Sequence, residues 1–217
     1  MKKNSNKKSS FNIYKLCKNL LDFLFSLFFL IAFLPIFIMI STLIKLSSRG
    51  PIFFLQERIG KNNIPFKCIK FRTMHPEAKD ILENLLMNDE NLKMEFEQNH
   101  KIKNDPRITT IGKFLRKTSL DELPQFINVL KNEMSIVGPR PIVNKEKKKY
   151  GNNFKKVLSV KPGITGLWQV SGRNNLTYKT RVKLDMNYIE NYNFLMDIRI
   201  LIRTIGVILF PLDRGAY

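Results

Sequence analysis

Residues 23–44 have the sequence FLFSLFFLIAFLPIFIMISTLI, a run of 22 residues without a charged side chain. As an α-helix, at ~1.5 Å per residue, the run would be about 33 Å long, enough to cross the hydrocarbon core of a bilayer. A secretory signal peptide fits less well, because its apolar region would be shorter and would lead to a small-residue cleavage site. A buried core helix is rarely so long and apolar on every side. The run therefore predicts a membrane segment.

Basic residues flank this run on both sides. Six lysines and no acidic residue precede Asp22, and seven basic residues follow up to Arg72, against Glu57 alone. Because flanks rich in Lys and Arg favour the cytoplasmic side, both ends favour the same leaflet. Pro35, near the middle, removes a backbone hydrogen bond and can bend a helix sharply. These residues are compatible both with a re-entrant helix and with a spanning helix that has a mild kink.

The composition narrows the kinds of partner and of site that this protein could have. The 217 residues are 44% hydrophobic, and 37 Lys and Arg against 18 Asp and Glu give a net charge of +19, which indicates an anionic partner. Nucleic acid is not expected, because the basic residues are spread along the chain without a recognised reader motif. The two cysteines and two histidines lie far apart and make no zinc-ligand spacing. A membrane surface or a phosphate-rich substrate remains.

The rest of the chain predicts an α+β fold that is mostly helical. Residues 52–74 suggest a β-hairpin with its turn at 60–63, because two short apolar runs flank a Gly-Lys-Asn-Asn sequence. Helices are expected at 76–98, 112–116, 121–131 and 177–190. A stiff loop is expected at 138–141 and a glycine-rich loop at 161–173. Residues 194–210 are apolar but interrupted by charges, which is typical of an amphipathic helix in the membrane interface.

Asp121 and Glu122 are the strongest candidate for a catalytic site, because they are adjacent carboxylates separated by only three residues from the cations Arg116 and Lys117. A purely structural interpretation is strong: Ser119 with Glu122 matches a capping box, and a helix capped at Asp121 would place Pro124 in its first turn. The functional interpretation uses the same position, since a helix start favours phosphate. One carboxylate could attack phosphorus, its neighbour could hold Mg²⁺, and Arg116 could neutralise phosphate charge.

The second candidate is Arg140, in the sequence Gly-Pro-Arg-Pro at 138–141. Two prolines restrict the backbone on both sides of this residue. That restriction suits bidentate binding of phosphate by one guanidinium, although a rigid connecting loop with a solvated Arg is the alternative.

Two further segments supply polar groups. Three glycines in 161–173 permit close backbone approach, and Gln169 and Arg173 follow them without matching a P-loop. Trp168 could stack on a base, but a place in the core or at the membrane interface is more common for a lone Trp. Lys70 and Arg72, at the end of the second hairpin strand, could face phosphate or lipid headgroups.

Taken together, these segments resemble the small monotopic phosphoglycosyl transferases, also called bacterial sugar transferases. The matching stretches are QERIG at 56–60, KFRTM at 70–74, DPRIT at 105–109, RKTSLDELPQ at 116–125, MSIVGPRP at 134–141 and KPGITG at 161–166. Each alone is weak, but their ordered combination covers nearly the whole chain. The chain departs from the family's pattern at Leu34, where a Ser often precedes the helix-breaking proline, and at Asn63 and Asn132, where glycine is usual. Asn tolerates left-handed backbone better than most residues, so both turns could persist.

The resemblance implies the transfer of a sugar 1-phosphate, such as a hexose 1-phosphate, from a UDP-sugar to undecaprenyl phosphate. It further implies a ping-pong reaction through an acyl phosphate on Asp121, with Glu122 and Asp121 holding Mg²⁺. Arg140 would bind phosphate, and we expect Arg116, Lys70, Arg72, Gln169 and Arg173 to line the site.

The resemblance also favours a re-entrant membrane helix over a spanning one. We therefore expect a basic segment at 1–19, a re-entrant helix at 20–46, and a catalytic domain at 47–217. This domain would lie on the cytoplasmic face of the bacterial inner membrane, bound to anionic lipids. The amphipathic helices would surround its active site. Whether the protein forms a homodimer is left open.

Three other functions are weighed against this one. A membrane-anchored, Mg²⁺-dependent phosphohydrolase would use the same carboxylates with water as acceptor. A non-catalytic membrane scaffold would not need Asp121. A membrane-anchored nucleic-acid-binding protein would bind DNA in a salt-dependent way and turn over no UDP-sugar.

Overall fold

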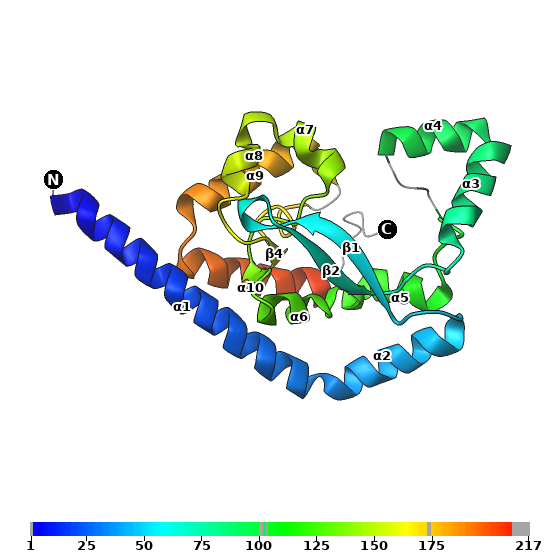
Figure 1. Ribbon diagram of the computed structural model, residues 1–217, viewed down its shortest axis with the longest axis horizontal. Coiled ribbons are helices and arrows are strands. Elements are labelled where there is room, and N and C mark those ends of the chain that lie inside the picture. Colours follow the sequence, from blue (N-terminus) through cyan, green and yellow to red (C-terminus); the bar gives the residue numbers. More distant parts are fainter. Residues whose placement is uncertain (1, 100–101, 103, 173–174, 210–217) are drawn as a thin grey trace. The chain divides into compact units, whose positions relative to one another are not determined.

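The apolar N-terminal run forms two helices that meet at a break. In the computed structural model, which describes residues 2–99, 102, 104–172 and 175–209, α1 (Lys2–Ala32) is followed by α2 (Leu34–Ser47) (Figure 1). The predicted bend is confirmed. It is explained by Pro35, because this residue lacks an N–H and its ring would meet the carbonyl of Ile31. No single described helix is long and apolar enough to cross a membrane, but residues 14–32 and 34–47 together meet that criterion, with a 62° bend.

The next elements are the predicted hairpin and helices, with one difference. The hairpin consists of β1 (Phe53–Ile59), the turn η1 (Lys61–Asn63) and β2 (Pro65–Phe71). Asn63 in this turn and Asn132 have φ of 65° and 64°, so both adopt the left-handed backbone expected of them. The helix predicted over 76–98 is instead two helices, α3 (Ala78–Asn88) and α4 (Glu90–Asn99). They separate because Asp89 is extended and its carboxylate accepts a hydrogen bond from the Leu92 N–H at 3.0 Å.

The C-terminal half contains short elements and two longer helices. These are α5 (Thr110–Thr118), η2 (Leu120–Glu122), α6 (Gln125–Leu130), β3 (Ser135–Val137), η3 (Asn144–Glu146), α7 (Lys147–Tyr150), η4 (Gly151–Asn153), α8 (Phe154–Val157), β4 (Gly163–Thr165), α9 (Tyr178–Asn191) and α10 (Phe194–Leu209). The segment 161–173 is not all loop as predicted, because β4 pairs in parallel with β3. The mostly helical α+β class is confirmed.

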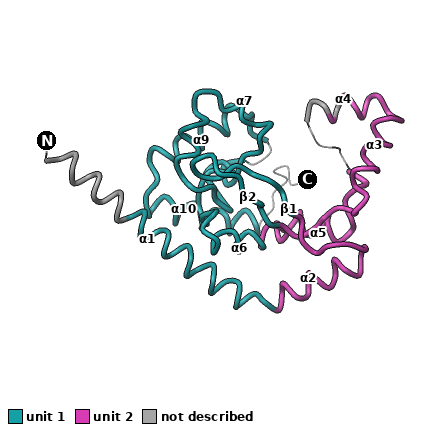
Figure 2. Tube along the Cα trace, in the orientation of Figure 1, with its two compact units in different colours: residues 1–34, 55–69, 124–216 teal, residues 35–54, 70–123, 217 magenta. Residues whose placement is uncertain are grey.

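The chain divides into two compact units (Figure 2). Unit 1 comprises residues 1–34, 55–69 and 124–216, and unit 2 comprises residues 35–54, 70–123 and 217. In unit 1, α1 packs on α6, where the rings of Phe29 and Phe126 stack with centroids 4.1 Å apart. In unit 2, the ring of Phe71 lies 5.4 Å from that of Phe37 and 5.5 Å from that of Phe53. Each unit thus has aromatic packing of its own.

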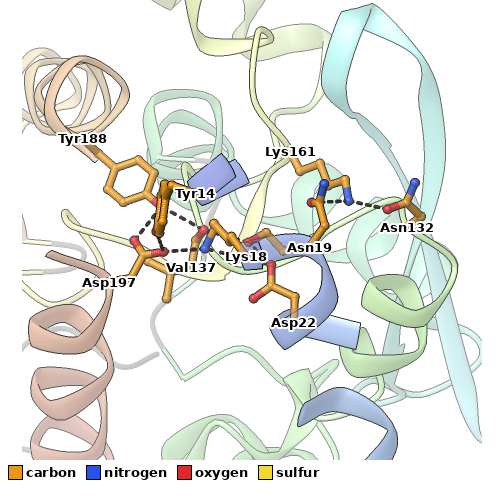
Figure 3. Close-up of polar contacts among 10 residues, drawn as sticks. Tyr14, Lys18, Asn19, Asp22, Asn132, Val137, Lys161, Tyr188 and Asp197 are labelled. Carbon is orange, nitrogen blue, oxygen red and sulfur yellow. Dashed lines mark hydrogen bonds and ion pairs between the residues drawn. The ribbon is translucent and has the colours of Figure 1, made fainter. Parts of the chain in front are cut away.

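A buried polar cluster joins α1 to α9 and α10 within unit 1 (Figure 3). The Asp197 carboxylate on α10 accepts hydrogen bonds from Tyr14 at 2.7 Å, Lys18 at 2.5 Å and Tyr188 at 2.8 Å. Asp22 on the same helix α1 accepts a hydrogen bond from the Ser135 hydroxyl of β3 at 2.6 Å. A buried carboxylate is stable only with such partners. The polar face of α1 is therefore fixed to the folded part of unit 1.

Candidate active site

The acidic pair lies in a turn and not at the start of a long helix. Asp121 and Glu122 belong to η2, which follows α5 after Ser119, a residue with φ 59° and ψ 16°. The predicted capping box and helix start are wrong, because Ser119 makes no side-chain cap and α6 begins only at Gln125. Proline lacks an N–H and fits best where a helix starts, so the helix begins after Pro124.

Two cations of unit 2 act on this pair. Lys70, the second-last residue of β2, places Nζ 2.7 Å from Oε1 of Glu122. Burial raises the pKa of Asp121 to about 6, and the Glu122 charge adds to the rise while Lys70 and Arg116 oppose it. Asp121 is therefore a carboxylate that is ionised near neutral pH but kept more basic than a solvated one.

Arg116 is held on the adjacent helix α5. Its Nε donates to Oγ1 of Thr73 at 3.0 Å. Burial lowers the pKa of Arg116, and the charges of Asp121 and Asp105 oppose that shift. Asp105 itself is engaged by Arg107, whose Nε and Nη2 donate to its two carboxylate oxygens at 2.8 and 2.6 Å.

The start of α5 is packed tightly against Thr73, the second residue after β2. The Thr109 hydroxyl accepts a hydrogen bond from the Gly112 N–H at 2.9 Å, and the Thr109 N–H donates to the Thr73 carbonyl at 3.1 Å. A Cβ at Gly112 would lie 1.9 Å from that carbonyl oxygen. Only glycine permits this approach, which positions the helix carrying Arg116.

Arg72 is buried, with 7% of its surface exposed. Its Nη2 donates to the backbone carbonyl of Ser48 at 2.8 Å and to the Ser48 hydroxyl at 2.9 Å. Its Nη1 lies beside Gly50, where a Cβ would come within 2.3 Å. Arg72 thus ties the end of β2 to the segment after α2, and its role toward substrate stays a prediction.

Arg140 sits in a loop of unit 1 that is fixed at several backbone atoms. The Gly163 N–H donates to the Pro139 carbonyl at 2.8 Å, and Nη1 of Arg58 donates to the Pro141 carbonyl at 2.8 Å. The stiff loop predicted at 138–141 is confirmed. Among the described residues, the Arg140 guanidinium makes no hydrogen bond or ion pair, and it lies 5.8 Å from the centroid of the Trp168 ring. Its donors are therefore available to an anion.

The glycine-rich segment 161–173 offers fewer accessible ligand-binding groups than the sequence predicted. Trp168 is only 5% exposed, so it belongs to the core and offers no open face for a base. Nε2 of Gln169 donates to the Ile164 carbonyl at 3.0 Å, and its buried Oε1 has no hydrogen-bond partner in the described part of the chain. Arg173 lies outside the described residues.

The structure brings five of the predicted residues into unit 2 and two into unit 1. Lys70, Arg72, Arg116, Asp121 and Glu122 belong to unit 2, and Arg140 and Gln169 belong to unit 1. Sequence reasoning missed the buried Asp185 and the role of Asp197. A carboxylate inside the apolar run 194–210 was the available signal for Asp197, whereas no local pattern singles out Asp185.

A metal at the acidic pair would have few protein ligands. The described residues contain no group of three or more His, Cys, Asp or Glu side chains that could hold a metal. Two adjacent carboxylates fit Mg²⁺, which usually takes one or two carboxylates and completes its shell with water and substrate phosphates. Burial raises the pKa of Asp121 most, and the repulsion by Glu122 that adds to this rise also favours a nearby dication.

Comparison with known proteins relates the chain to one family. The family model described as bacterial sugar transferase matches residues 13–211. An exopolysaccharide production protein of Sinorhizobium fredii is 42% identical over 200 residues, which cover 92% of this chain and 88% of that protein. An uncharacterised sugar transferase of Haemophilus influenzae is 47% identical over 195 residues, 90% of this chain and 41% of that protein.

A third relative carries a more specific name. The undecaprenyl-phosphate galactose phosphotransferase of Salmonella typhimurium is 50% identical over 160 residues, which cover 74% of this chain and 34% of that protein. The chain therefore spans less than half the length of two of these three relatives.

Proposed function

This chain belongs to the bacterial sugar transferase family, and we propose that it transfers a sugar 1-phosphate from a UDP-sugar to undecaprenyl phosphate with release of UMP. The names of its relatives, which include an undecaprenyl-phosphate galactose phosphotransferase and an exopolysaccharide production protein, support this reaction class. The product, undecaprenyl diphosphate sugar, would begin the membrane stage of exopolysaccharide or capsule synthesis.

The observation that carries the proposal is the acidic pair beside two cations. A buried carboxylate with a pKa of about 6 remains ionised at neutral pH and is a better nucleophile than a solvated one. Lys70 and Arg116, which oppose the rise of this pKa, are placed to accept the charge of a phosphate as it approaches.

We propose a ping-pong sequence at Asp121. A carboxylate oxygen attacks the phosphorus that carries the sugar, and the bond from this phosphorus to the bridging oxygen breaks, so that UMP leaves. The acyl phosphate that forms holds the sugar phosphate on the protein. A phosphate oxygen of undecaprenyl phosphate then attacks the same phosphorus and regenerates the carboxylate.

Mg²⁺ is proposed as the cofactor, held by Glu122 and Asp121. When bound, it would supply charge neutralisation between the carboxylates and the phosphate oxygens. Lys70 holds Oε1 of Glu122 at 2.7 Å and thereby orients this side chain. Arg140, with a fixed backbone and a guanidinium that makes no hydrogen bond or ion pair in the described region, would bind a substrate phosphate.

The protein is proposed to lie on the cytoplasmic face of the inner membrane through a re-entrant helix at 20–46. Large apolar side chains are exposed along α1 and α2, which make up the re-entrant segment, and along α10. They are far more numerous than a soluble surface usually shows. They include Leu20, Leu24, Phe28 and Ile31 on α1, Ile38, Met39, Leu43 and Leu46 on α2, and Leu195, Ile202, Ile205 and Leu209 on α10. Lysines near an anionic leaflet would add about 1 kcal/mol each to this association.

The test measures UMP release from a panel of UDP-sugars in the presence of undecaprenyl phosphate and Mg²⁺. With a sugar-labelled donor and no acceptor, label should remain on the wild-type protein and should be absent from Asp121→Asn. Asp80→Asn, an exposed change of the same charge on α3, is the matched control.

Three results would contradict the proposal. Label on the Asp121→Asn protein would show that another residue is the nucleophile. Turnover without undecaprenyl phosphate would indicate the phosphohydrolase. Unchanged function in vivo with Asp121→Asn would indicate the scaffold.

A further inference from the structure

Two guanidinium groups share one aromatic ring in unit 1. The Cζ of Arg181, on α9, lies 4.8 Å from the centroid of the Trp168 ring, and the Cζ of Arg140 lies 5.8 Å from the same centroid. Cation–π contact with a buried indole holds each planar group in a defined place. The ring thus brings together two cations that are 41 residues apart in the sequence.

Both guanidiniums are positioned by further contacts. Nε of Arg181 donates to the Leu176 carbonyl at 3.2 Å. The loop of Arg140 is fixed at its backbone by Gly163 and Arg58. Burial lowers the pKa of Arg181, and the Arg140 charge lowers it further, so the two cations repel each other in this arrangement. Such repulsion is relieved when an anion binds between or beside them.

Two acidic groups act on this pair through their charge, Glu146 on Arg181 and Asp185 on Arg140, and both are also engaged by other residues. Asp185 is fully buried, its Oδ2 accepts a hydrogen bond from the Tyr150 hydroxyl at 2.8 Å, and it makes no ion pair with Arg140. Glu146 accepts a hydrogen bond from the Val143 N–H at 3.1 Å and lies 3.9 Å from Nη1 of Arg58, a third cation. Among the described residues named here, three arginines thus accompany two carboxylates.

We propose that Arg181 and Arg140 together form a binding site for a phosphate group, with Trp168 as the platform that holds both guanidiniums. This inference rests on the proposed function and adds Arg181 to the substrate-binding residues. The shared chemistry is a phosphate oxyanion bound by planar N–H donors. Its source is either the diphosphate of the nucleotide donor or the phosphate of the polyprenyl acceptor.

Trp168 is the only tryptophan of the chain, so its fluorescence reports on this site alone. This chain, reconstituted in lipid vesicles without any other protein, is titrated with UDP and, separately, with undecaprenyl phosphate, and the fluorescence change gives a Kd for each. Arg181→Gln removes the charge, Arg181→Lys keeps the charge without the planar fork, and Lys183→Gln removes an exposed charge from the same helix as a control.

We expect Arg181→Gln to weaken one of the two probes about tenfold or more, and Arg181→Lys to weaken it less, because a guanidinium binds phosphate with two parallel donors. Lys183→Gln should bind both probes like the wild type. Weaker binding of UDP assigns the site to the donor, and weaker binding of undecaprenyl phosphate assigns it to the acceptor.

Wild-type affinity of Arg181→Gln for both probes would overturn the inference. If Arg181→Gln does not fold, Arg181→Lys decides in the same way, with an expected loss of about threefold or more. The proposed function is tested separately, because binding needs no turnover. A wild-type protein that binds a probe but turns over no UDP-sugar contradicts the function alone, and normal turnover with normal binding by both variants contradicts the site alone.

Discussion

Replacing Asp185 by Asn should make the protein more stable at pH 8.5 and change its stability little at pH 5. Asp185 is 0% exposed, and its Oδ1 has no hydrogen-bond partner in the described part of the chain. Burial raises the pKa of this carboxyl to about 7, although the Tyr150 hydroxyl and the Arg140 charge oppose the rise. The folded protein therefore resists ionisation of this group.

The size of the expected change in stability follows from the difference in the pKa of Asp185 between the folded and the unfolded protein. An unfolded Asp has a pKa of about 4, so between about pH 4 and 7 the folded protein holds a proton that the unfolded chain has lost. Because the folded state binds more protons in this window, its stability falls as pH rises through it. At about 1.4 kcal/mol per unit, three units amount to about 4 kcal/mol. Asn cannot ionise, and its side-chain carbonyl can still accept the Tyr150 hydrogen bond, so Asp185→Asn should avoid this loss.

The measurement is the thermal unfolding midpoint in nanodiscs at pH 5 and pH 8.5. About 4 kcal/mol corresponds to a shift on the order of 10 °C for a chain of this size. We expect Asp185→Asn to exceed the wild type by such an amount at pH 8.5 and to differ by a few degrees at most at pH 5. Asp80→Asn carries the same change in net charge at an exposed position and is the control. An Asp185→Asn shift that is equal at both pH values would refute the reasoning.

Three further results are expected. Gly112→Ala places a Cβ 1.9 Å from the Thr73 carbonyl oxygen and should cost about 1–3 kcal/mol or more in the free energy of unfolding, seen as a lower midpoint in thermal denaturation. Lys18→Met leaves the buried Asp197 without its ammonium partner at 2.5 Å and should cost about 3–5 kcal/mol, whereas a midpoint like that of the wild type would show that the tyrosines alone suffice. Burial raises the pKa of Asp121 to about 6 in the metal-free protein, so at limiting Mg²⁺ kcat/KM for UMP release should fall as pH drops below about 6 and level off above about 7; a profile at limiting Mg²⁺ that is flat from pH 5 to 8 would contradict its role as nucleophile.

The amino-acid sequence by itself determined the features that depend on neighbours along the chain. The break before Pro35 follows from the missing N–H, and the turn at Asn63 follows from the tolerance of Asn for left-handed backbone. The hairpin, α5 and α9 could be predicted from local sequence patterns, whereas the break between α3 and α4 and the start of α6 were not. The membership of the family and the acidic pair Asp121 and Glu122 could likewise be predicted from ordered local motifs.

Only the tertiary structure decided which distant groups meet. The ion pair between Lys18 and Asp197 joins residues 179 positions apart, and the Trp168 ring collects two arginines from separate elements. The glycine-rich segment 161–173 became partly a strand because β3 provided a partner. The environment that raises the pKa of Asp121 likewise needs folding, since burial, which raises it, and the charge of Lys70, which opposes the rise, both come from elsewhere in the chain. Backbone preferences act over a few residues, whereas desolvation and charge act through space, and these set the chemistry of a carboxylate.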